Sequence, residues 1–510
     1  MDKKRLIQNM ATSILSVLLS TLVSFFITSR IVEKIGGDAY GFMKLSNDFI
    51  SYASLITIAL NSMASRYVMI SLNKGDREEA KKYYNSVFFS NIVLSVILII
   101  PSLIVVFYCN FFLDVPSEIL FDVQLNFAIT FTNFLVSLSF STLGQAYSLT
   151  NRLYLGSVRE MQATIIRTVL IVALFMFCGI KIYYLAFATL VTNLYVIAWN
   201  YYFRRKLIPD FNLDIHLFEW KKVKKLLLSG IWNSITKLSQ LFSSGLDLLV
   251  TNIFIDSASM GILSIAKTIP NMIVSFNASI SGVFTPDLTK LYAQEKKDEL
   301  VYAVKSSMRI MCIFVSIPNA ILVAIGSQLF HLWVPSQSAV MLQILSILTL
   351  VNSVVTGVLQ PIYSVFTIID KVKQNSIVMI IYGASSILMT LCTLYFTDLG
   401  VYAVAGVSMV GSLIVALCYH LPMSAKYLGL SKLTFFPEII MSVTSFVLLS
   451  GIGYITSLIV PAGESWVWWF ASAIIIGIIG LALNFYLVLK KEERHMIIGK
   501  IKTRIYGEKI

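Results

Sequence analysis

Apolar runs of about 20 residues recur along almost the whole of this 510-residue chain. Each run is long enough to cross the roughly 30 Å hydrocarbon core of a bilayer as an α-helix, and we count roughly fourteen of them. Charged residues make up only 13% of the chain, whereas about a quarter is typical of soluble proteins. The sequence therefore predicts an all-α integral membrane protein without a soluble domain.

Lysine and arginine gather in one set of alternate loops. These loops include residues 3–5, 74–82, 204–225, 290–297 and 490–509. Because basic residues in short loops mark the cytoplasmic side, we predict that both termini are cytoplasmic. Attraction to anionic lipid on that side also explains much of the formal net charge of +13, so the charge implies a bilayer and no nucleic-acid partner.

An internal repeat relates the two halves of the chain. The segments "DAYGFMKLSND" and "SASMGILSIAK" align Gly41 with Gly261, an offset of 220 residues, and the same offset aligns the loop charges at 77–79 with those at 297–299. Six helices fall within one period, so both copies enter the membrane in the same direction. Parallel repeats of this kind are typical of transporters, whose substrate lies between two lobes.

The repeat predicts two six-helix lobes followed by two additional C-terminal helices. The predicted segments are an N-lobe at 1–206, a basic cytoplasmic linker at 207–225, a C-lobe at 226–430, the additional helices at 431–490 and a basic cytoplasmic tail at 491–510.

Charged residues within the apolar runs are the strongest indication of function. Asp48 and Arg66 are five helical turns apart and share one helix face with Lys44. Lys237 lies about 17 Å along its helix from the basic cluster, too deep to reach the near headgroups easily. A charge at the centre of a membrane helix costs about 2.5 to 3.5 kcal/mol, so such residues predict a hydrated cavity.

We therefore predict a substrate-binding cavity in which basic groups attract an anion, since Arg and Lys both suit phosphate oxygens. The predicted cavity residues are Arg30, Lys44, Asp48, Arg66, Arg167, Asn233, Lys237, Gln240, Asp247 and Lys267. Five of them also have a structural interpretation. Arg30, Lys44 and Arg66 lie near membrane edges, where snorkelling or topology explains a charge, and Arg167 and Lys267 lie within snorkelling range.

Two carboxylates in this set, Asp48 and Asp247, are candidates for binding a coupling H+ or Na+, because intramembrane acids mark such relays. We expect no other cofactor and no metal site. The chain has no GxxxxGK[ST] loop, no HExxH helix and no serine elbow, so ATP hydrolysis and hydrolytic catalysis have no support. The sequence predicts a transporter and not an enzyme.

Four motifs, "IGGDAYGFMKLS", "NKGDREEAKKYY", "GILSIAKTIPN" and "GVFTPDLTKLY", resemble the MOP exporter superfamily, in particular its Wzx-type polysaccharide flippases. The resemblance implies a cationic central cavity and a flippase of the bacterial cytoplasmic membrane. Its implied substrate is an undecaprenyl-diphosphate-linked oligosaccharide repeat unit, moved to the outer leaflet for capsule, O-antigen or teichoic acid assembly. Polysaccharide polymerase and assembly proteins are the implied partners.

Similarity to the related lipid II flippases implies a substrate role for Lys44 and Lys267, which lie in "KLSN" and "KTIPN". The same analogy implies a groove for the lipid tail along residues 435–489. Three alternatives stay open: a MATE-like, ion-coupled multidrug exporter, a lipid II flippase, and a membrane enzyme such as a polymerase or ligase. The excess of buried bases disfavours the exporter of cationic drugs, and the short external loops disfavour the enzyme.

Overall fold

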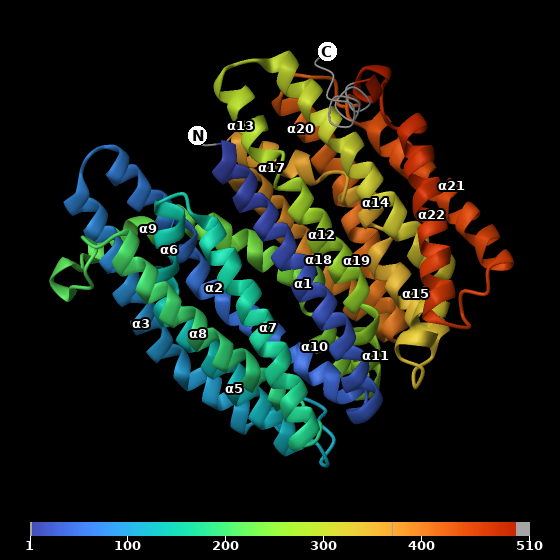
Figure 1. Cartoon of the computed structure of the whole chain (residues 1–510), viewed down its shortest axis with the longest axis horizontal. Helices are drawn as coiled ribbons and strands as arrows, with labels where there is room; N and C mark the ends of the chain where they lie inside the picture. Colours follow the sequence, from blue (N-terminus) through green and yellow to red (C-terminus); the bar gives the residue numbers. More distant parts are fainter. Residues whose placement is uncertain (1–2, 370, 496–510) are drawn as a thin grey trace. The chain divides into compact units, whose positions relative to one another are not determined.

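The structure is a computed structural model that describes residues 3–369 and 371–495 (Figure 1). The described residues form helices and no strand, which confirms the predicted all-α membrane fold. Among them, 11 helices are long and apolar enough to cross a membrane. Three further helices of sufficient length, α1 (Lys3–Ile35), α8 (Tyr183–Leu207) and α9 (Trp220–Gln240), are not among these 11, so the predicted count of about fourteen is not confirmed.

The chain divides into two compact units. Unit 1 contains residues 1–265 and 373–404, and unit 2 contains residues 266–372 and 405–510. The predicted lobe boundaries were derived from the internal repeat and differ from this division. They stay a prediction. The predicted cytoplasmic tail at 491–510 lies outside the described residues from residue 496 onwards.

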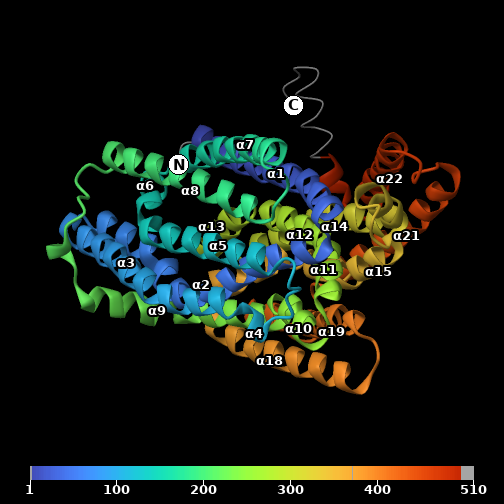
Figure 2. The same ribbon diagram turned by 90° about the horizontal axis from the view of Figure 1, so that it is seen from below.

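Unit 1 holds the helices up to α11 together with α18. Its elements are α1 (Lys3–Ile35), α2 (Gly37–Asn73), α3 (Arg77–Phe107), α4 (Cys109–Phe112), α5 (Leu120–Phe140), η1 (Ser141–Gly144), α6 (Gln145–Leu149), α7 (Leu153–Phe177), α8 (Tyr183–Leu207), η2 (Ile215–Leu217), α9 (Trp220–Gln240), the π-helical η3 (Leu241–Gly245), α10 (Asp247–Phe254), α11 (Ser257–Ala266) and α18 (Val372–Phe396). Within it, α3, α5 and α8 lie side by side (Figures 1 and 2).

Unit 2 holds most of the remaining helices. Its elements are α12 (Thr268–Ser281), α13 (Thr285–Ala293), α14 (Lys297–Trp333), α15 (Ala339–Leu350), α16 (Ser353–Thr356), α17 (Gln360–Ile368), most of α19 (Val401–Val415), the π-helical η4 (Ala416–His420), α20 (Leu421–Tyr427), α21 (Phe436–Ile459) and α22 (Trp466–Leu487). The two helices outside the predicted repeat, α21 and α22, both pack against α14.

Close helix crossings in unit 1 depend on glycine. A Cβ built on Gly230 of α9 would lie 1.9 Å from the carbonyl oxygen of Ala59 on α2. A Cβ on Gly41 of α2 would lie 3.1 Å from the Cα of Gly261 on α11, so the two glycines that the repeat aligns pack against each other. Small residues at such crossings let helix backbones approach closely, as is usual in membranes.

Hydrogen bonds attach the predicted basic linker, residues 207–225, to the first half of α3. Asn85 is fully buried; its Nδ2 donates to the carbonyl of Asn212 at 3.1 Å, and its Oδ1 accepts from the amide of Asp214 at 2.9 Å. Buried Ser86 accepts from the amide of Glu219 at 2.9 Å. Because these bonds satisfy linker backbone groups, they fix the point at which α9 begins.

A buried ion cluster joins α14 to the C-terminal elements of unit 2. Arg309, which is 2% exposed, pairs with Glu438 of α21 at 3.1 Å and with Glu493 at 2.7 Å. Farther along, Asn484 of α22 accepts from Ser445 at 2.6 Å and donates to Ser316 of α14 at 3.1 Å. The additional helices are therefore held to α14 by polar groups that cannot separate without leaving partners unsatisfied.

Candidate functional site

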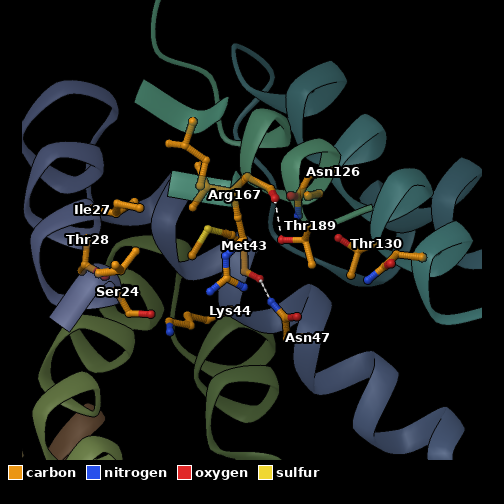
Figure 3. A pocket seen from close by; sticks show the side chains of 15 residues that line it. Ser24, Ile27, Thr28, Met43, Lys44, Asn47, Asn126, Thr130, Arg167 and Thr189 are labelled. Atoms are coloured by element: carbon orange, nitrogen blue, oxygen red, sulfur yellow. Dashed lines mark hydrogen bonds between the residues drawn. The ribbon is translucent and has the colours of Figure 1, made fainter. Parts of the chain in front are cut away.

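A cavity of about 240 Å³ lies within unit 1 (Figure 3). Five helices supply its walls, namely α1, α2, α5, α7 and α8. The lining residues are Val23, Ser24, Ile27, Thr28, Met43, Lys44, Asn47, Asn126, Thr130, Asn133, Arg167, Ile171, Leu185, Ala186 and Thr189. Its walls thus combine aliphatic side chains with hydroxyls, amides and two cations.

The two cations are Lys44 of α2 and Arg167 of α7, both half-buried. Lys44 lies over the ring of Tyr40, one helical turn earlier, at 5.2 Å from the ring centroid. None of the described residues that line the cavity is a carboxylate. Glu160, two helical turns before Arg167 on α7, interacts electrostatically with Arg167 but does not line the cavity. The lining itself is therefore positively charged and favours an anion, and partial burial keeps this attraction from being fully screened.

Neutral polar side chains of α5 form a second wall. Asn126, Thr130 and Asn133 follow at spacings of four and three residues, which places them on one helix face. Asn133 is held by Asn193 of α8, whose Nδ2 donates to the Asn133 Oδ1 at 2.8 Å. We did not predict this stripe from the sequence, although the same spacing that drew attention to Lys237 was present.

Asp48 and Asp247 do not line this cavity. Both carboxylates lie within electrostatic range of Tyr52, whose hydroxyl donates to the carbonyl of Gly245 at 2.8 Å. Asp247 is 9% exposed. The structure therefore brings the two predicted coupling-ion candidates to one place in unit 1, while their role stays a prediction.

The expected continuous polar stripe of the seventh predicted helix is interrupted. We expected Asn233, Lys237, Gln240 and Asp247 to share one narrow face, but α9 ends at Gln240 and a π-helical turn precedes α10. The wider turn changes the register, so Asp247 no longer follows the regular helical spacing. π-turns of this kind are frequent at functional sites.

The other residues of this stripe lie outside the cavity. Asn233 donates to Ser62 of α2 at 3.0 Å, and Gln240 is exposed. Lys237 is half-buried, and its side chain forms no ion pair or hydrogen bond with the residues described in its unit. This environment agrees with a deep, accessible cation, but the substrate contact predicted for Lys237 stays a prediction.

The last three predicted residues lie apart from the cavity. Arg30 at the end of α1 and Arg66 of α2 are exposed. Lys267 is half-buried at the break between α11 and α12 and belongs to unit 2. Of the ten predicted residues, the cavity therefore brings together Lys44 and Arg167. Within the described residues no group of three His, Cys, Asp or Glu side chains could hold a metal ion.

The fold is similar to that of two solved membrane transporters. The inward closed conformation of the lipid II flippase MurJ superposes with a TM-score of 0.70 at 15% identity, covering 98% of this chain and all of that chain. An inward-facing MATE multidrug resistance transporter of the MOP superfamily superposes with a TM-score of 0.62 at 14% identity, covering 83% of this chain and 94% of its own. At these identities the likeness concerns the fold alone.

Sequence comparison then assigns the family. Residues 6–292 match the polysaccharide biosynthesis protein family, so the chain belongs to that family. A full-length relative is the "Uncharacterized membrane protein EpsK" of Bacillus subtilis (strain 168), which is 25% identical over 501 residues, 97% of each chain. The resemblance read from the four sequence motifs is thereby confirmed.

Proposed function

We propose that the protein is a flippase for undecaprenyl-diphosphate-linked oligosaccharide repeat units. It moves them from the cytoplasmic to the outer leaflet of the bacterial cytoplasmic membrane by alternating access, for capsule, O-antigen or teichoic acid assembly. Both termini face the cytoplasm, and polysaccharide polymerase and assembly proteins take up the exported unit. Asp48 and Asp247 are the proposed binding sites for a coupling H+ or Na+.

The observation that carries this proposal is the cavity that contains Lys44 and Arg167 but no lining carboxylate. The costly step in flipping such a lipid is the passage of a diphosphate and several sugars through hydrocarbon, where unsatisfied polar groups are strongly disfavoured. Fixed cations replace the hydration of the phosphates, and neutral amides and hydroxyls replace that of the sugars. The prenyl tail needs no such replacement because it stays in lipid.

A MATE-like multidrug exporter is the second candidate. Its superposition covers 83% of this chain, whereas the lipid II flippase covers 98%. A cavity for cationic drugs also needs acidic groups, and the described lining supplies bases instead. These two observations favour a lipid-linked, anionic substrate, with lipid II itself as one member of that class.

The test reconstitutes the purified protein in vesicles that contain fluorescent undecaprenyl-diphosphate-linked glycan and measures how fast the glycan becomes accessible on the opposite leaflet. We expect Lys44→Ala and Arg167→Ala each to reduce the rate at least ten-fold, because each removes one phosphate-binding charge. Lys181→Ala is the matched control, since Lys181 is an exposed lysine paired with Asp122 outside the cavity.

Two outcomes would overturn the proposal. One is wild-type flipping in both cavity variants. The other is transport of cationic drugs by the same vesicles without movement of the glycan, which selects the exporter. In cells, Lys237→Ala tests the further cation: we expect loss of exported glycan at unchanged protein level, and normal surface polysaccharide would remove Lys237 from the proposed pathway.

A further inference from the structure

The cavity cation Lys44 lies against a tyrosine ring that does not itself line the cavity. The ammonium nitrogen of Lys44 is 5.2 Å from the centroid of the Tyr40 ring, within the roughly 6 Å at which an aromatic face attracts a cation. Tyr40 is 0% exposed and is not a lining residue, whereas Lys44 is half-buried and lines the cavity (Figure 3). The ring therefore lies behind Lys44 as seen from the cavity.

Two neighbouring helices fix the position of this ring. Its backbone belongs to α2, one helical turn before Lys44, and residues at this spacing are neighbours on one helix face. At the other end of the side chain, the Tyr40 hydroxyl accepts a hydrogen bond at 3.3 Å from the hydroxyl of Thr28 on α1, which is also buried. The ring is thus a fixed surface beside a flexible side chain.

A lysine in an anion-binding cavity has to be held in place without losing its charge to a partner. Its stem is long and flexible, and none of the described lining residues is a carboxylate that could hold the ammonium of Lys44. An aromatic face attracts the ammonium electrostatically but carries no net charge. An ammonium also has three N–H donors, so it can contact a ring on one side and an anion on the other.

We propose that Tyr40 is a positioning residue whose ring holds the Lys44 ammonium where it binds the diphosphate of the lipid-linked substrate. Tyr40 acts through Lys44 and does not touch the substrate. A binding group that is already in place raises affinity, because less conformational freedom is lost when the ligand arrives. This inference rests on the proposed function, since it takes Lys44 to bind the diphosphate.

The first test changes the charge distribution of the ring and keeps its shape. Native mass spectrometry measures the affinity of the purified protein in lipid nanodiscs for undecaprenyl diphosphate. We expect Tyr40→Phe to bind within about two-fold of wild type, because the ring face is kept. Trifluorophenylalanine at the same position is expected to bind about five-fold more weakly than phenylalanine, because fluorine withdraws the negative charge of the ring face. Equal affinities, or tighter binding with the fluorinated ring, would overturn the inference.

The second test asks whether Tyr40 acts through Lys44. In the wild-type background, Tyr40→Leu is expected to lower the affinity for undecaprenyl diphosphate about five-fold. In the Lys44→Ala background the ring has no ammonium to hold, so the same substitution is expected to leave the residual affinity unchanged. A residue that only supports the packing of α1 against α2 would weaken binding in both backgrounds. Equal losses would therefore count against the inference, and the fluorinated ring decides the question if Tyr40→Leu does not fold.

Tyr201→Leu is the matched control. The guanidinium of Arg205 lies over the Tyr201 ring at 4.8 Å, again one helical turn away, but neither residue lines the cavity. This variant is expected to bind as wild type does. The outcomes also separate the inference from the proposed function. If Lys44→Ala binds undecaprenyl diphosphate as tightly as wild type, the cavity is not the phosphate site and the proposed function itself fails. A clear loss in Lys44→Ala with no effect of fluorination would refute the role of Tyr40 alone.

Discussion

The crossing of α2 and α9 predicts a strong effect for Gly230→Ala. The added methyl carbon would lie 1.9 Å from the carbonyl oxygen of Ala59 and 2.7 Å from its carbonyl carbon. Real Cβ atoms essentially never approach within 3.0 Å of other heavy atoms, so the two backbones must separate by about 1 Å. Overpacking of this kind typically costs about 1–3 kcal/mol.

Separation also strains the hydrogen bonds that span the same crossing. Ser234 donates to the carbonyl of Leu55 at 3.0 Å, and the hydroxyls of Tyr67 and Ser229 lie 2.8 Å apart. Interhelical hydrogen bonds in membranes contribute about 0.6 kcal/mol each on average. Loss of both brings the expected destabilisation to roughly 2–4 kcal/mol.

Unfolding of the purified protein in mixed micelles of increasing SDS content measures this change in the free energy of unfolding. Gly477→Ala in α22 is the matched control: it is also a helical glycine, but nothing lies within 4 Å of its added Cβ. That control is expected to be neutral or up to about 1 kcal/mol more stable, because alanine is the better helix former. Equal stability of the two variants would refute the reasoning from the crossing.

Three further predictions use the same measurement. Gly261→Ala places a Cβ 2.6 Å from the Gly37 carbonyl carbon, and we expect a loss of about 1–3 kcal/mol; wild-type stability would show that α2 and α11 are not in contact. Asn85→Ala leaves linker backbone groups unpaired, so we expect about 1–3 kcal/mol of destabilisation and faster proteolysis within 207–219; unchanged proteolysis would contradict the pinned linker. Burial raises the pKa of Glu493, but hydrogen bonds led by that from Arg309 outweigh it and hold this pKa below its usual 4.5. The ionised Glu493 carboxylate therefore stabilises the fold fully above pH 4.5, and this stabilisation is lost as the pH falls below that value. We expect Glu493→Gln to have a lower free energy of unfolding at pH 7 and to lack this part of its pH dependence. Parallel plots of the free energy of unfolding against pH for the variant and the wild type would contradict the assignment.

Much of the fold was accessible from the sequence because a bilayer imposes strict local rules. Helix lengths and the positions of most helices follow from runs of apolar residues. We did not predict the start of α3 from the sequence: its apolar run begins near Asn85, whereas the helix begins at Arg77. Gly75 has a φ of 80° before it, and Asp76 caps the helix by accepting from the amide of Glu79 at 2.9 Å. Motif resemblance supplied the family.

The sequence predicted only part of the candidate site. Lys44 and Arg167 were noticed because a charge in a membrane helix is costly and therefore conspicuous. The polar stripe of Asn126, Thr130 and Asn133 was missed because a neutral polar side chain costs less free energy in a membrane helix than a charge does. Such side chains are also common in helix contacts, so their spacing alone does not distinguish a cavity wall from helix packing. Likewise, the sequence did not show the interruption after α9, where the Gly245 carbonyl accepts from Tyr52 of α2.

The sequence by itself thus determined that this chain is a helical membrane protein of the polysaccharide biosynthesis protein family, with costly charges in its apolar runs. Hydrophobicity and charge are properties of each residue and its near neighbours, so they can be read along the chain. Only the tertiary structure decided that Lys44 and Arg167 share one cavity. That depends on how α2 and α7 pack with their neighbours, which is set by side-chain fit between distant segments.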